Sequence, residues 1–472
     1  MGKQFDLSFL KGQRILVLGL SRTGRSVAGA LNQAGIEAVG WDDGEAARRA
    51  ASESGISVSD PHGALETFDL VVLSPGIPRT YPAPNKLVAQ AEAAGTPIIG
   101  DQDLLAQACP EARTIGITGT NGKSTTTALI GHLLDQAGVH SAVGGNIGLA
   151  ALSLPVLDPE GWYVLELSSF QLETLSVCAF DIAILLNVTP DHEDRYADMA
   201  AYVAAKDRIF ERPRGLSAAI IGADDDYSRQ LLDTHRRIGR HKVVPISAER
   251  PVDGGLAYLK DRIVDRMASG SEQILPLGKL PALPGAHNRQ NAAAAHVAAR
   301  LAGLSDKQIA EGLASFAGLA HRQQAVATVS GVRFVNDSKA TNPDAAARAL
   351  SSYDNIYWIA GGQAKGDDFS ALDEALSGVK RAFLIGQSAE TMAKALNSKV
   401  PNTIAGTLDQ AIQKAFAAAR SDDDPDPVVL LSPACASFDQ FENFEKRGDR
   451  FCELAMTLAD AQGDRLAAGG SR

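Results

Sequence analysis

The stretch that decides the fold is TIGITGTNGKSTTT, at residues 114–127. Its pattern predicts a short apolar strand, then a turn bracketed by two glycines, and then a helix that opens with Lys-Ser-Thr. Main-chain N–H groups of such a turn and the positive end of the helix dipole point toward one place, which suits the phosphates of a nucleotide. The segment therefore predicts an α/β fold that holds a nucleoside triphosphate.

The loop is shorter than the common phosphate-binding pattern G-x-x-x-x-G-K-[ST]. Counting back from Gly122, the place of the first glycine is taken by Ile117, and the glycine lies at Gly119. In this shorter loop Lys123 would meet the outer phosphates and the Ser124 hydroxyl would bind Mg²⁺. An ordinary strand–turn–helix junction, with Gly and Asn as turn formers, is the alternative. The residues expected to hold ATP are Gly119, Thr120, Asn121, Gly122, Lys123, Ser124 and Thr125.

Composition and charge describe a soluble globular protein of several domains. The chain has 472 residues, of which 45% are hydrophobic and 21% charged, and this length implies roughly two to four domains. The formal net charge of −11, without an offsetting basic cluster, argues against a nucleic-acid partner. The four cysteines are widely spaced, which argues against a disulfide framework or a zinc site and favours a reducing compartment.

The sequence also predicts a cytoplasmic protein without membrane insertion. The first residues lack the continuous apolar region and the small-residue cleavage site of a signal peptide. No run of about 18 apolar residues occurs along the chain.

The alternation of strands and helices divides the chain into three α/β blocks. We expect a Rossmann-like N-terminal domain over residues 1–101, a P-loop-type central ATPase domain over 102–318, and a Rossmann-like C-terminal domain over 319–472. Because the strands end in polar residues, parallel sheets with ligand groups at their carboxyl edges are expected. Ligands would then lie in clefts between the domains, and domain closure would be part of the cycle.

The first block begins with a strand at 14–18 and a turn at 19–24 that resembles the dinucleotide pattern G-x-G-x-x-G. Ser21 stands where the second glycine belongs, although an acidic pair that begins at Asp42 lies about 20 residues further on, as a ribose-binding acid would. A dinucleotide site is one interpretation. A site for another nucleotide-like ligand is the interpretation we favour.

Two more strands of the central block lead into side chains suited to a cation. The strand at 162–167 carries Glu166, and the strand at 181–188 runs toward His192. A carboxylate and an imidazole near a triphosphate are natural cation ligands. The alternatives are a structural charge at a strand end and a surface histidine. Lys206, on the helix that follows, would by the sequence pattern alone be a solvated lysine.

The third block repeats the pattern of strands that end in polar clusters. We expect strands at 332–335, 356–360, 382–385 and 428–431. Three of them are followed by polar segments, at 336–339, 361–365 and 432–437. These segments are expected to carry ligand groups.

With these motifs in place, the chain resembles the Mur ligases, the amide-forming ligases that build the peptide of bacterial cell-wall precursors. The resemblance covers essentially the whole length and begins with TGTNGKST at 118–125. It continues through the segments at 144–148, 166–173, 187–196, 285–291 and 321–322. NDSKATN at 336–342 and LSPACASFDQF at 431–441 are similar to the D-glutamate-adding branch, and the Asp-Asn-Pro-Arg signature of diaminopimelate-adding relatives does not occur.

The resemblance implies an ATP-dependent reaction through an acyl phosphate. The carboxylate of UDP-N-acetylmuramoyl-L-alanine would attack the γ-phosphate of ATP, and the amine of D-glutamate would then displace phosphate. The implied partners are these three small molecules, and the implied cofactors are ATP and Mg²⁺ at two sites. We expect the protein to act as a monomer.

Site residues follow from the resemblance position by position. The implied catalytic residues are Lys123, Glu166, His192 and Lys206, and one Mg²⁺ would be held by Ser124 and Glu166 and the other by His192 and Lys206. In the family the lysine matched by Lys206 is carbamylated. The remaining ATP contacts are Asn291, Arg322 and Asp337. The contacts to the UDP substrate are Arg22, Thr23, Asp42, Ser74, Asn146 and His192.

For D-glutamate the matched residues are Lys339, Thr341, Lys365, Ser437, Phe438 and Phe444. Lysines and hydroxyl groups suit a dicarboxylate amino acid. Core packing is the alternative for the two phenylalanines.

Three other functions remain as alternatives. One is another amide ligase of the same architecture, such as a folylpolyglutamate synthase. A second is a nicotinamide-dependent dehydrogenase that uses the turn at 19–24, and a third is a nucleotide-binding module without catalysis. The polar segments of the third block argue against the first, and the phosphate loop would be unexplained in the second.

Overall fold

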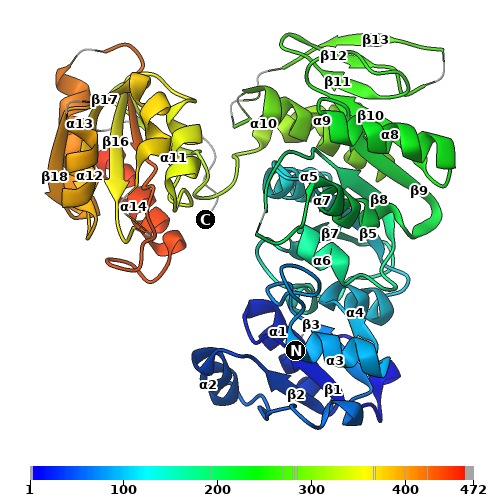
Figure 1. The fold of residues 1–472 in the computed structure, drawn as a ribbon. Coiled ribbons are helices and arrows are strands. Elements are labelled where there is room, and N and C mark those ends of the chain that lie inside the picture. The colour runs from blue at the N-terminus through cyan, green and yellow to red at the C-terminus, as the bar shows by residue number, and fades with distance from the viewer. Residues whose placement is uncertain are drawn as a thin grey trace. The chain divides into compact units, whose positions relative to one another are not determined.

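The structure is a computed structural model that describes residues 4–462, apart from 193, 269, 279, 281, 284, 365, 367, 398 and 423. The chain packs as two compact units that divide after Ala314. The first unit contains two β-sheets and the second contains one, and helices pack against each sheet (Figure 1). The three-part α/β architecture expected from the sequence is therefore confirmed.

The first sheet is small and fully parallel, with the strand order β2-β1-β3-β4. Its strands are β1 (Ile15–Leu18), β2 (Ala38–Trp41), β3 (Leu70–Leu73) and β4 (Ile98–Ile99). The helices of this region are α1 (Arg22–Gln33), α2 (Glu45–Glu53), α3 (Lys86–Ala94) and α4 (Asp101–Ala108), with 3-10 turns η1 (Ser8–Leu10) and η2 (Leu65–Thr67). Leu16 and Leu18 pack on one side of β1, and Ile15 and Val17 pack on the other, so the strand is buried on both faces as parallel strands usually are.

The central sheet has nine strands in the order β13-β12-β11-β10-β9-β8-β5-β7-β6. The parallel part consists of β5 (Arg113–Thr118), β6 (Ser141–Gly145), β7 (Trp162–Glu166), β8 (Phe180–Leu185), β9 (Pro213–Gly222) and β10 (Lys242–Ser247). The helices are α5 (Lys123–Gln136), α6 (Ser169–Glu173), α7 (Met199–Asp207), α8 (Asp226–Ile238), α9 (Gly285–Leu301) and α10 (Asp306–Ser315), with 3-10 turns η3 (Ala151–Ser153) and η4 (Arg208–Phe210). Because β8, β5 and β7 are parallel neighbours, the segments that follow them meet at one edge.

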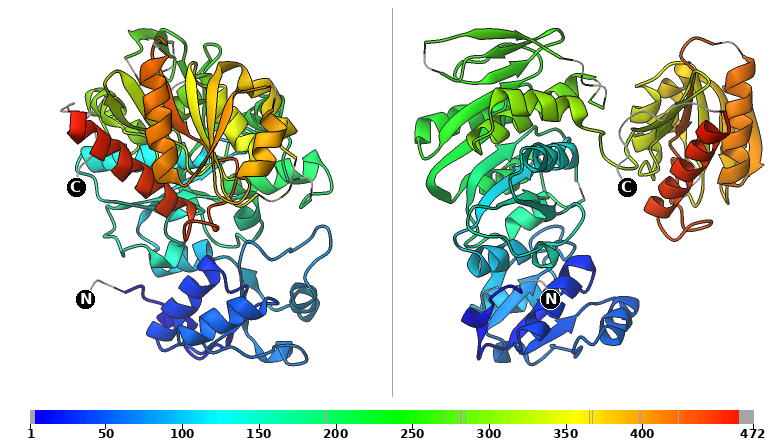
Figure 2. Two further views of the ribbon diagram at one scale, coloured as in Figure 1. Left: turned by 90° about the vertical axis from the view of Figure 1, so that its left-hand side faces the viewer. Right: turned by 180° about the vertical axis from the view of Figure 1, so that it is seen from behind.

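A short meander extends this sheet at the edge away from the first sheet (Figures 1 and 2). It consists of β11 (Leu256–Tyr258), β12 (Arg262–Asp265) and β13 (Gln273–Pro276), and its two inner pairings are antiparallel. The sequence pattern does not predict these strands, because three or four residues are too few for a clear period of two.

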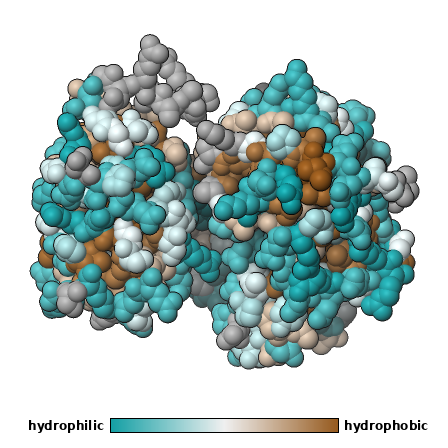
Figure 3. Space-filling view, turned by 90° about the horizontal axis from the view of Figure 1, so that it is seen from above, coloured by the Kyte–Doolittle hydropathy of each residue, from teal (hydrophilic) through white to brown (hydrophobic). Residues whose placement is uncertain are grey.

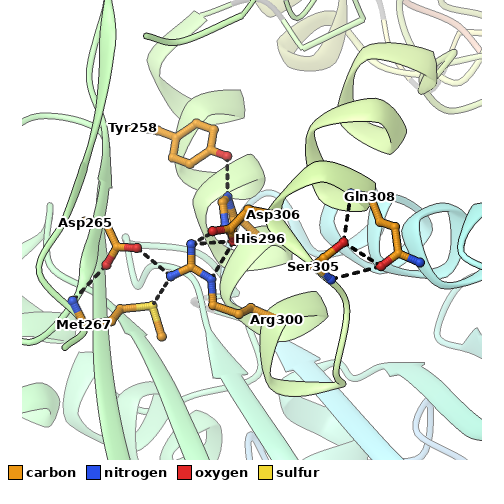
Figure 4. A network of polar contacts seen from close by, with 8 residues as sticks. All are labelled: Tyr258, Asp265, Met267, His296, Arg300, Ser305, Asp306 and Gln308. Carbon is orange, nitrogen blue, oxygen red and sulfur yellow. Dashed lines mark hydrogen bonds and ion pairs between the residues drawn. The ribbon is translucent and has the colours of Figure 1, made fainter. Parts of the chain in front are cut away.

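A partly buried polar network connects α9 to this meander (Figure 4). The ring of His296 lies 2.7 Å from the Tyr258 hydroxyl through Nδ1 and 2.9 Å from Nη2 of Arg300 through Nε2. Arg300 also pairs with Asp265 and Asp306. Burial and the adjacent guanidinium lower the pKa of His296 to about 4, so the ring is a neutral acceptor for Arg300. The network anchors the carboxyl end of the helix whose other end lies against the phosphate loop.

The third sheet forms the second unit, with the order β14-β15-β19-β16-β17-β18. Its strands are β14 (Gln324–Val329), β15 (Val332–Asn336), β16 (Ile356–Gly361), β17 (Val379–Ile385), β18 (Asn402–Gly406) and β19 (Val428–Leu431), and only β14 is antiparallel to its neighbour. The helices are α11 (Pro343–Leu350), α12 (Ala389–Leu396), α13 (Leu408–Ser421) and α14 (Phe444–Gln462), with the 3-10 segment η5 (Ser370–Gly378). The first pair of helices packs on one face and the second pair on the other.

Polar side chains cover most of the face seen in Figure 3, with smaller apolar areas between them. Within the part of the chain that the structure describes, no helix combines the length and the apolar character needed to cross a bilayer.

Candidate active site

The phosphate loop joins β5 to α5, as its sequence predicts. Gly119 and Gly122 have φ angles of 151° and 85°, which residues with a side chain rarely adopt. A Cβ atom on Gly122 would lie 2.2 Å from Oδ1 of Asn291, on α9. Asn291, a predicted ATP contact, therefore lies directly against the loop, and only glycine permits this approach.

The segment that follows β8 holds the loop in place. The amide of Asn187 accepts a hydrogen bond from Asn121 N at 2.9 Å and donates one to Asn121 O at 3.2 Å. The Thr120 hydroxyl accepts from Thr189 N at 3.1 Å. Sequence reasoning did not single out Asn187, although an amide that can donate and accept at once is well suited to fixing a loop.

Two lysine side chains converge on the carbonyl of Gly119. Nζ of Lys123 donates to Gly119 O and to Thr120 O, each at 2.8 Å. Nζ of Lys206, which is 1% exposed, donates to the same Gly119 O at 2.8 Å. The interpretation of Lys206 as a solvated lysine is therefore wrong, because α7 turns this position toward the loop. Burial and the nearby Lys123 charge lower the pKa of Lys206 to about 6.

Glu166 ends β7 at the same edge and is 2% exposed. Its Oε1 accepts from Nδ2 of Asn146 at 2.9 Å, whereas Oε2 is buried without a hydrogen-bond partner among the described residues. Burying a carboxylate oxygen without a hydrogen-bond partner costs folding free energy unless a cation binds to it. Ser124, in the first turn of α5, is also buried.

These donors fit a magnesium ion that takes its remaining ligands from nucleotide phosphates. Among the described residues, no group of three or more His, Cys, Asp and Glu side chains is arranged as a metal site on its own.

His192 follows β8 in a left-handed conformation, with φ of 57°. About 40% of its side chain is exposed, and its ring packs on Phe170 at 5.0 Å and on Tyr202 at 5.9 Å between centroids. The Tyr202 ring also lies 4.5 Å from Nζ of Lys206. His192 and Lys206 thus contact the same tyrosine, which places them at one site.

At the carboxyl edge of the first sheet, two predicted substrate contacts shape the turn after β1. The buried hydroxyl of Ser74 donates to Gly19 O at 2.7 Å, and the Asp42 carboxylate accepts from Leu20 N at 2.8 Å. Thr23, in the first turn of α1, is half-buried beside this turn. These two contacts fix the backbone of the turn after β1.

Arg22 and Asn146, also predicted substrate contacts, meet each other. The exposed guanidinium of Arg22 donates to Gly148 O at 2.7 Å, to Asn146 O at 3.1 Å and to Gly145 O at 3.4 Å. Sequence reasoning placed both residues near the UDP substrate but did not foresee this contact between the first and the second sheet.

In the second unit, Asp337 follows β15 and is buried. Its carboxylate accepts from the Ser432 hydroxyl at 2.8 Å and from Gln323 N at 3.1 Å. Burial raises the pKa of Asp337 to about 7, and the charge of nearby Arg322 opposes part of this rise. The two predicted ATP contacts of this unit, Arg322 and Asp337, therefore lie close together.

Four of the predicted D-glutamate residues, Lys339, Thr341, Ser437 and Phe438, lie in the segments after β15 and β19, and Phe444 opens α14. Nζ of Lys339 lies 5.4 Å from the ring centroid of half-buried Phe444. Thr341 is half-buried and Ser437 is buried. Lys365 lies outside the described residues.

Phe438 is 69% exposed, so the core-packing alternative is wrong for this residue. An aromatic ring that a protein keeps in solvent beside polar loops is available to a ligand.

Sequence reasoning missed Arg447, which lies in the first turn of α14 and is 1% exposed. It donates from Nε to the Ser338 hydroxyl at 3.0 Å, from Nη2 to Ser338 O at 2.8 Å and from Nη1 to Cys435 O at 3.1 Å. Burial lowers its pKa to about 10. Arg447 thus links the segment after β15 to the segment after β19. No sequence pattern distinguishes it from the other charged residues of the helix.

Comparison with known proteins agrees with this geometry. Residues 117–299 match the family model of the Mur ligase middle domain, and residues 321–435 match that of the Mur ligase glutamate ligase domain. The chain is 49% identical, over 96% of its length and 98% of the relative's, to a UDP-N-acetylmuramoylalanine–D-glutamate ligase of Paramagnetospirillum magneticum. The chain belongs to the Mur ligase family. 

Other relatives of this Mur ligase carry the same name. The ligase of Rhodospirillum rubrum is 45% identical to this chain, over 97% of this chain and 98% of the relative. The ligase of Phenylobacterium zucineum is 43% identical, over 97% of this chain and 99% of the relative.

Solved structures share the fold of this Mur ligase. The UDP-N-acetylmuramate–alanine ligase MurC of Thermotoga maritima matches with a TM-score of 0.54 and 19% identity, over 94% of this chain and 99% of that one. A UDP-N-acetylmuramoyl-L-alanyl-D-glutamate–2,6-diaminopimelate ligase matches with a TM-score of 0.56 and 19% identity, over 84% and 93%.

Proposed function

We propose that this Mur ligase joins D-glutamate to UDP-N-acetylmuramoyl-L-alanine in an ATP-dependent reaction of peptidoglycan precursor synthesis in the cytoplasm. The strongest support for this proposal is the sequence similarity, over nearly the whole chain, to ligases named for that reaction. The buried edge of the central sheet, where two lysines and a carboxylate surround the phosphate loop, supplies the chemistry that such a ligase needs.

The reaction has two steps, and each brings negatively charged reactants together. A carboxylate oxygen of the L-alanyl end attacks the γ-phosphorus of ATP, the bond to the β–γ bridging oxygen breaks, and ADP leaves. The ammonium of D-glutamate loses a proton, and the resulting amine attacks the acyl carbon of the acyl phosphate. The tetrahedral intermediate then loses a second proton from its nitrogen to water as the C–O bond to phosphate breaks. Positioning and charge neutralisation therefore provide most of the rate enhancement.

The residues of the central sheet hold the phosphates and the acyl end. The loop amides and Lys123 bind the transferring phosphoryl group. Ser124 and Glu166 would hold one Mg²⁺, and His192 and Lys206 would hold a second. Bound Mg²⁺ neutralises charge on the phosphates and the acyl phosphate. Lys206 is buried beside the loop, and addition of CO₂ to its amine with loss of a proton would turn a repelling ammonium into a carboxylate ligand.

The other assignments follow the predicted domains, with boundaries after residues 101 and 318. The UDP substrate lies at the edge of the first sheet, contacted by Arg22, Thr23, Asp42, Ser74, Asn146 and His192. The remaining contacts to ATP are made by Asn291, Arg322 and Asp337. D-glutamate is bound by Lys339, Thr341, Lys365, Ser437, Phe438 and Phe444, and the enzyme acts as a monomer.

A substrate-omission assay tests the proposed function. Purified protein is mixed with ATP, Mg²⁺, UDP-N-acetylmuramoyl-L-alanine and D-glutamate, and ADP and phosphate release are measured as each component is left out. We expect sustained release only with all four components. Turnover with L-glutamate but not with D-glutamate would contradict the stereochemical assignment, and turnover without any amino acid would contradict the ligase assignment.

A further inference from the structure

The loop at 145–149, which follows β6, presents its main-chain carbonyls to a residue of the first sheet region. Gly145 N donates to Leu149 O at 2.8 Å, which closes the loop, and Gly145 and Gly148 have φ angles of 96° and 59°. Three carbonyls of this loop, those of Gly145, Asn146 and Gly148, accept hydrogen bonds from Arg22. A planar guanidinium with its donors in a fixed fork is suited to such a set of acceptors.

The same loop holds the buried carboxylate of the candidate cation site. Asn146 N donates to Glu166 O at 2.9 Å, and Asn146 Nδ2 donates to Glu166 Oε1 at 2.9 Å. Gly145 is paired with Glu166 in the β6–β7 register, and a Cβ atom on Gly145 would lie 2.4 Å from Glu166 O. Asn146 is therefore fixed between Arg22, through its carbonyl, and Glu166, through its two N–H donors.

These contacts form one short path between the two sheets. Arg22 opens α1 directly after the turn that follows β1, where the UDP substrate is expected. One residue, Asn146, separates its guanidinium from the Glu166 carboxylate. The second oxygen of that carboxylate, Oε2, is the buried one that has no hydrogen-bond partner among the described residues. The direction of Oε2 depends on the bond that Asn146 makes to Oε1.

We propose that Arg22 is a positioning residue that fixes Asn146 and thereby orients the Glu166 carboxylate toward the cation. The proposal rests on the proposed function, in which Glu166 holds Mg²⁺, and it adds a structural task to the substrate contact expected of Arg22. Arg22 thus links the nucleotide-binding edge of the first sheet to the phosphate-binding edge of the second. The α1 helix has another contact to the central region, between the Ser26 and Ser153 hydroxyls at 2.7 Å, which does not involve Arg22.

The test compares Arg22→Leu and Arg22→Lys with Arg25→Leu, a matched control that removes an exposed arginine of the same helix. Hydrogen exchange is measured at the amides of 145–149 in the ligand-free protein, and Mn²⁺ binding in the presence of ADP is measured by electron paramagnetic resonance. We expect Arg22→Leu to speed exchange at the Asn146 amide and to weaken Mn²⁺ binding about 5- to 10-fold, near the lower range for groups that orient metal ligands. Arg22→Lys should lie between this variant and the wild type, and Arg25→Leu should match the wild type.

Unchanged exchange and unchanged Mn²⁺ affinity in Arg22→Leu would overturn the proposal and leave Arg22 as a substrate contact only. The same substitution in an Asn146→Ala background gives a second test, because the Mn²⁺ effect of Arg22→Leu should disappear there if Asn146 transmits it. A full effect in that background would also overturn the proposal. Neither readout needs turnover, so failure of the D-glutamate assignment in the omission assay would remain distinguishable.

Discussion

The phosphate-binding edge of the central sheet and the polar edge of the third sheet hold their side chains in different ways. At the central edge, Lys206 is 1% exposed and Glu166 is 2% exposed, and Lys206 donates a hydrogen bond to the loop backbone. At the third edge, Phe438 is 69% exposed and Lys339 lies beside an aromatic ring. The first edge is therefore preorganised for charge, whereas the second consists of more exposed polar segments that Arg447 links to each other.

This difference predicts how the two edges respond to mutation. A preorganised group aimed at a reacting phosphoryl group lowers the barrier of the chemical step, so its loss reduces kcat. A group that shapes the proposed D-glutamate site contributes the same binding free energy to the bound substrate and to the transition state. Its loss therefore raises KM and leaves kcat nearly unchanged.

The largest effect is expected for Lys123→Ala. Removing the ammonium charge that Lys123 places at the loop, where the proposed mechanism puts the transferring phosphoryl group, should lower kcat by about 10³-fold, the upper range for one preorganised donor. Steady-state ADP release measures this, and circular dichroism checks that the variant is folded. Near-normal turnover would show that the central edge is not the site of phosphoryl transfer.

Lys206→Ala should lower activity by about 10²-fold or more, because it removes a cation ligand in the proposed mechanism. Added short carboxylates should restore part of the activity by occupying the space of the proposed carbamate. Lys307→Ala, at a lysine that is 84% exposed, is the matched control and should retain full activity. An inactive variant that no carboxylate rescues would contradict the carbamate assignment.

Arg447→Met tests the other side of the comparison. The change leaves Ser338 O and Cys435 O without their buried donor, so we expect KM for D-glutamate to rise about 10-fold and the free energy of unfolding to fall by about 2–4 kcal/mol. KM for ATP should stay close to the wild-type value. Arg450→Met, one turn along α14 and 43% exposed in its side chain, is the control. A larger effect on kcat than on KM would remove the distinction between the two edges.

The smallest expected effect is a pH dependence of the stability of the second unit. The pKa of Asp337 is raised to about 7, so the folded chain keeps a proton that the unfolded chain releases near pH 4. This contribution is complete below pH 4 and is lost as the pH rises through 7. Asp337→Asn should flatten that part of the profile, which thermal unfolding of the full chain between pH 4 and 8 can measure. An equal slope in both proteins would contradict the buried, protonated state.

Most of the fold and much of the central edge could be predicted from the sequence. The strand–turn–helix order at 114–127, the strands that lead to Glu166 and His192, and the three-part α/β architecture all appear as predicted. The meander β11–β13 was missed because its strands are short. Lys206 was misjudged because its burial depends on a loop that lies 87 residues away in the sequence.

By itself, the sequence determined the features that depend on local spacing. Glycines at 119 and 122, an apolar strand before them and Lys-Ser after them specify a phosphate loop, because φ preferences and the helix dipole act over a few residues. Only the tertiary structure decided which distant side chains hold the loop at 145–149 and the segment after β15. Arg22 reaches carbonyls 123 to 126 residues away, and Arg447 reaches Ser338 across 109 residues. The Arg447 contacts follow from the order of parallel strands, which brings the segments after β15 and β19 to one edge, whereas the Arg22 contacts join two different sheets. No short sequence pattern encodes either set.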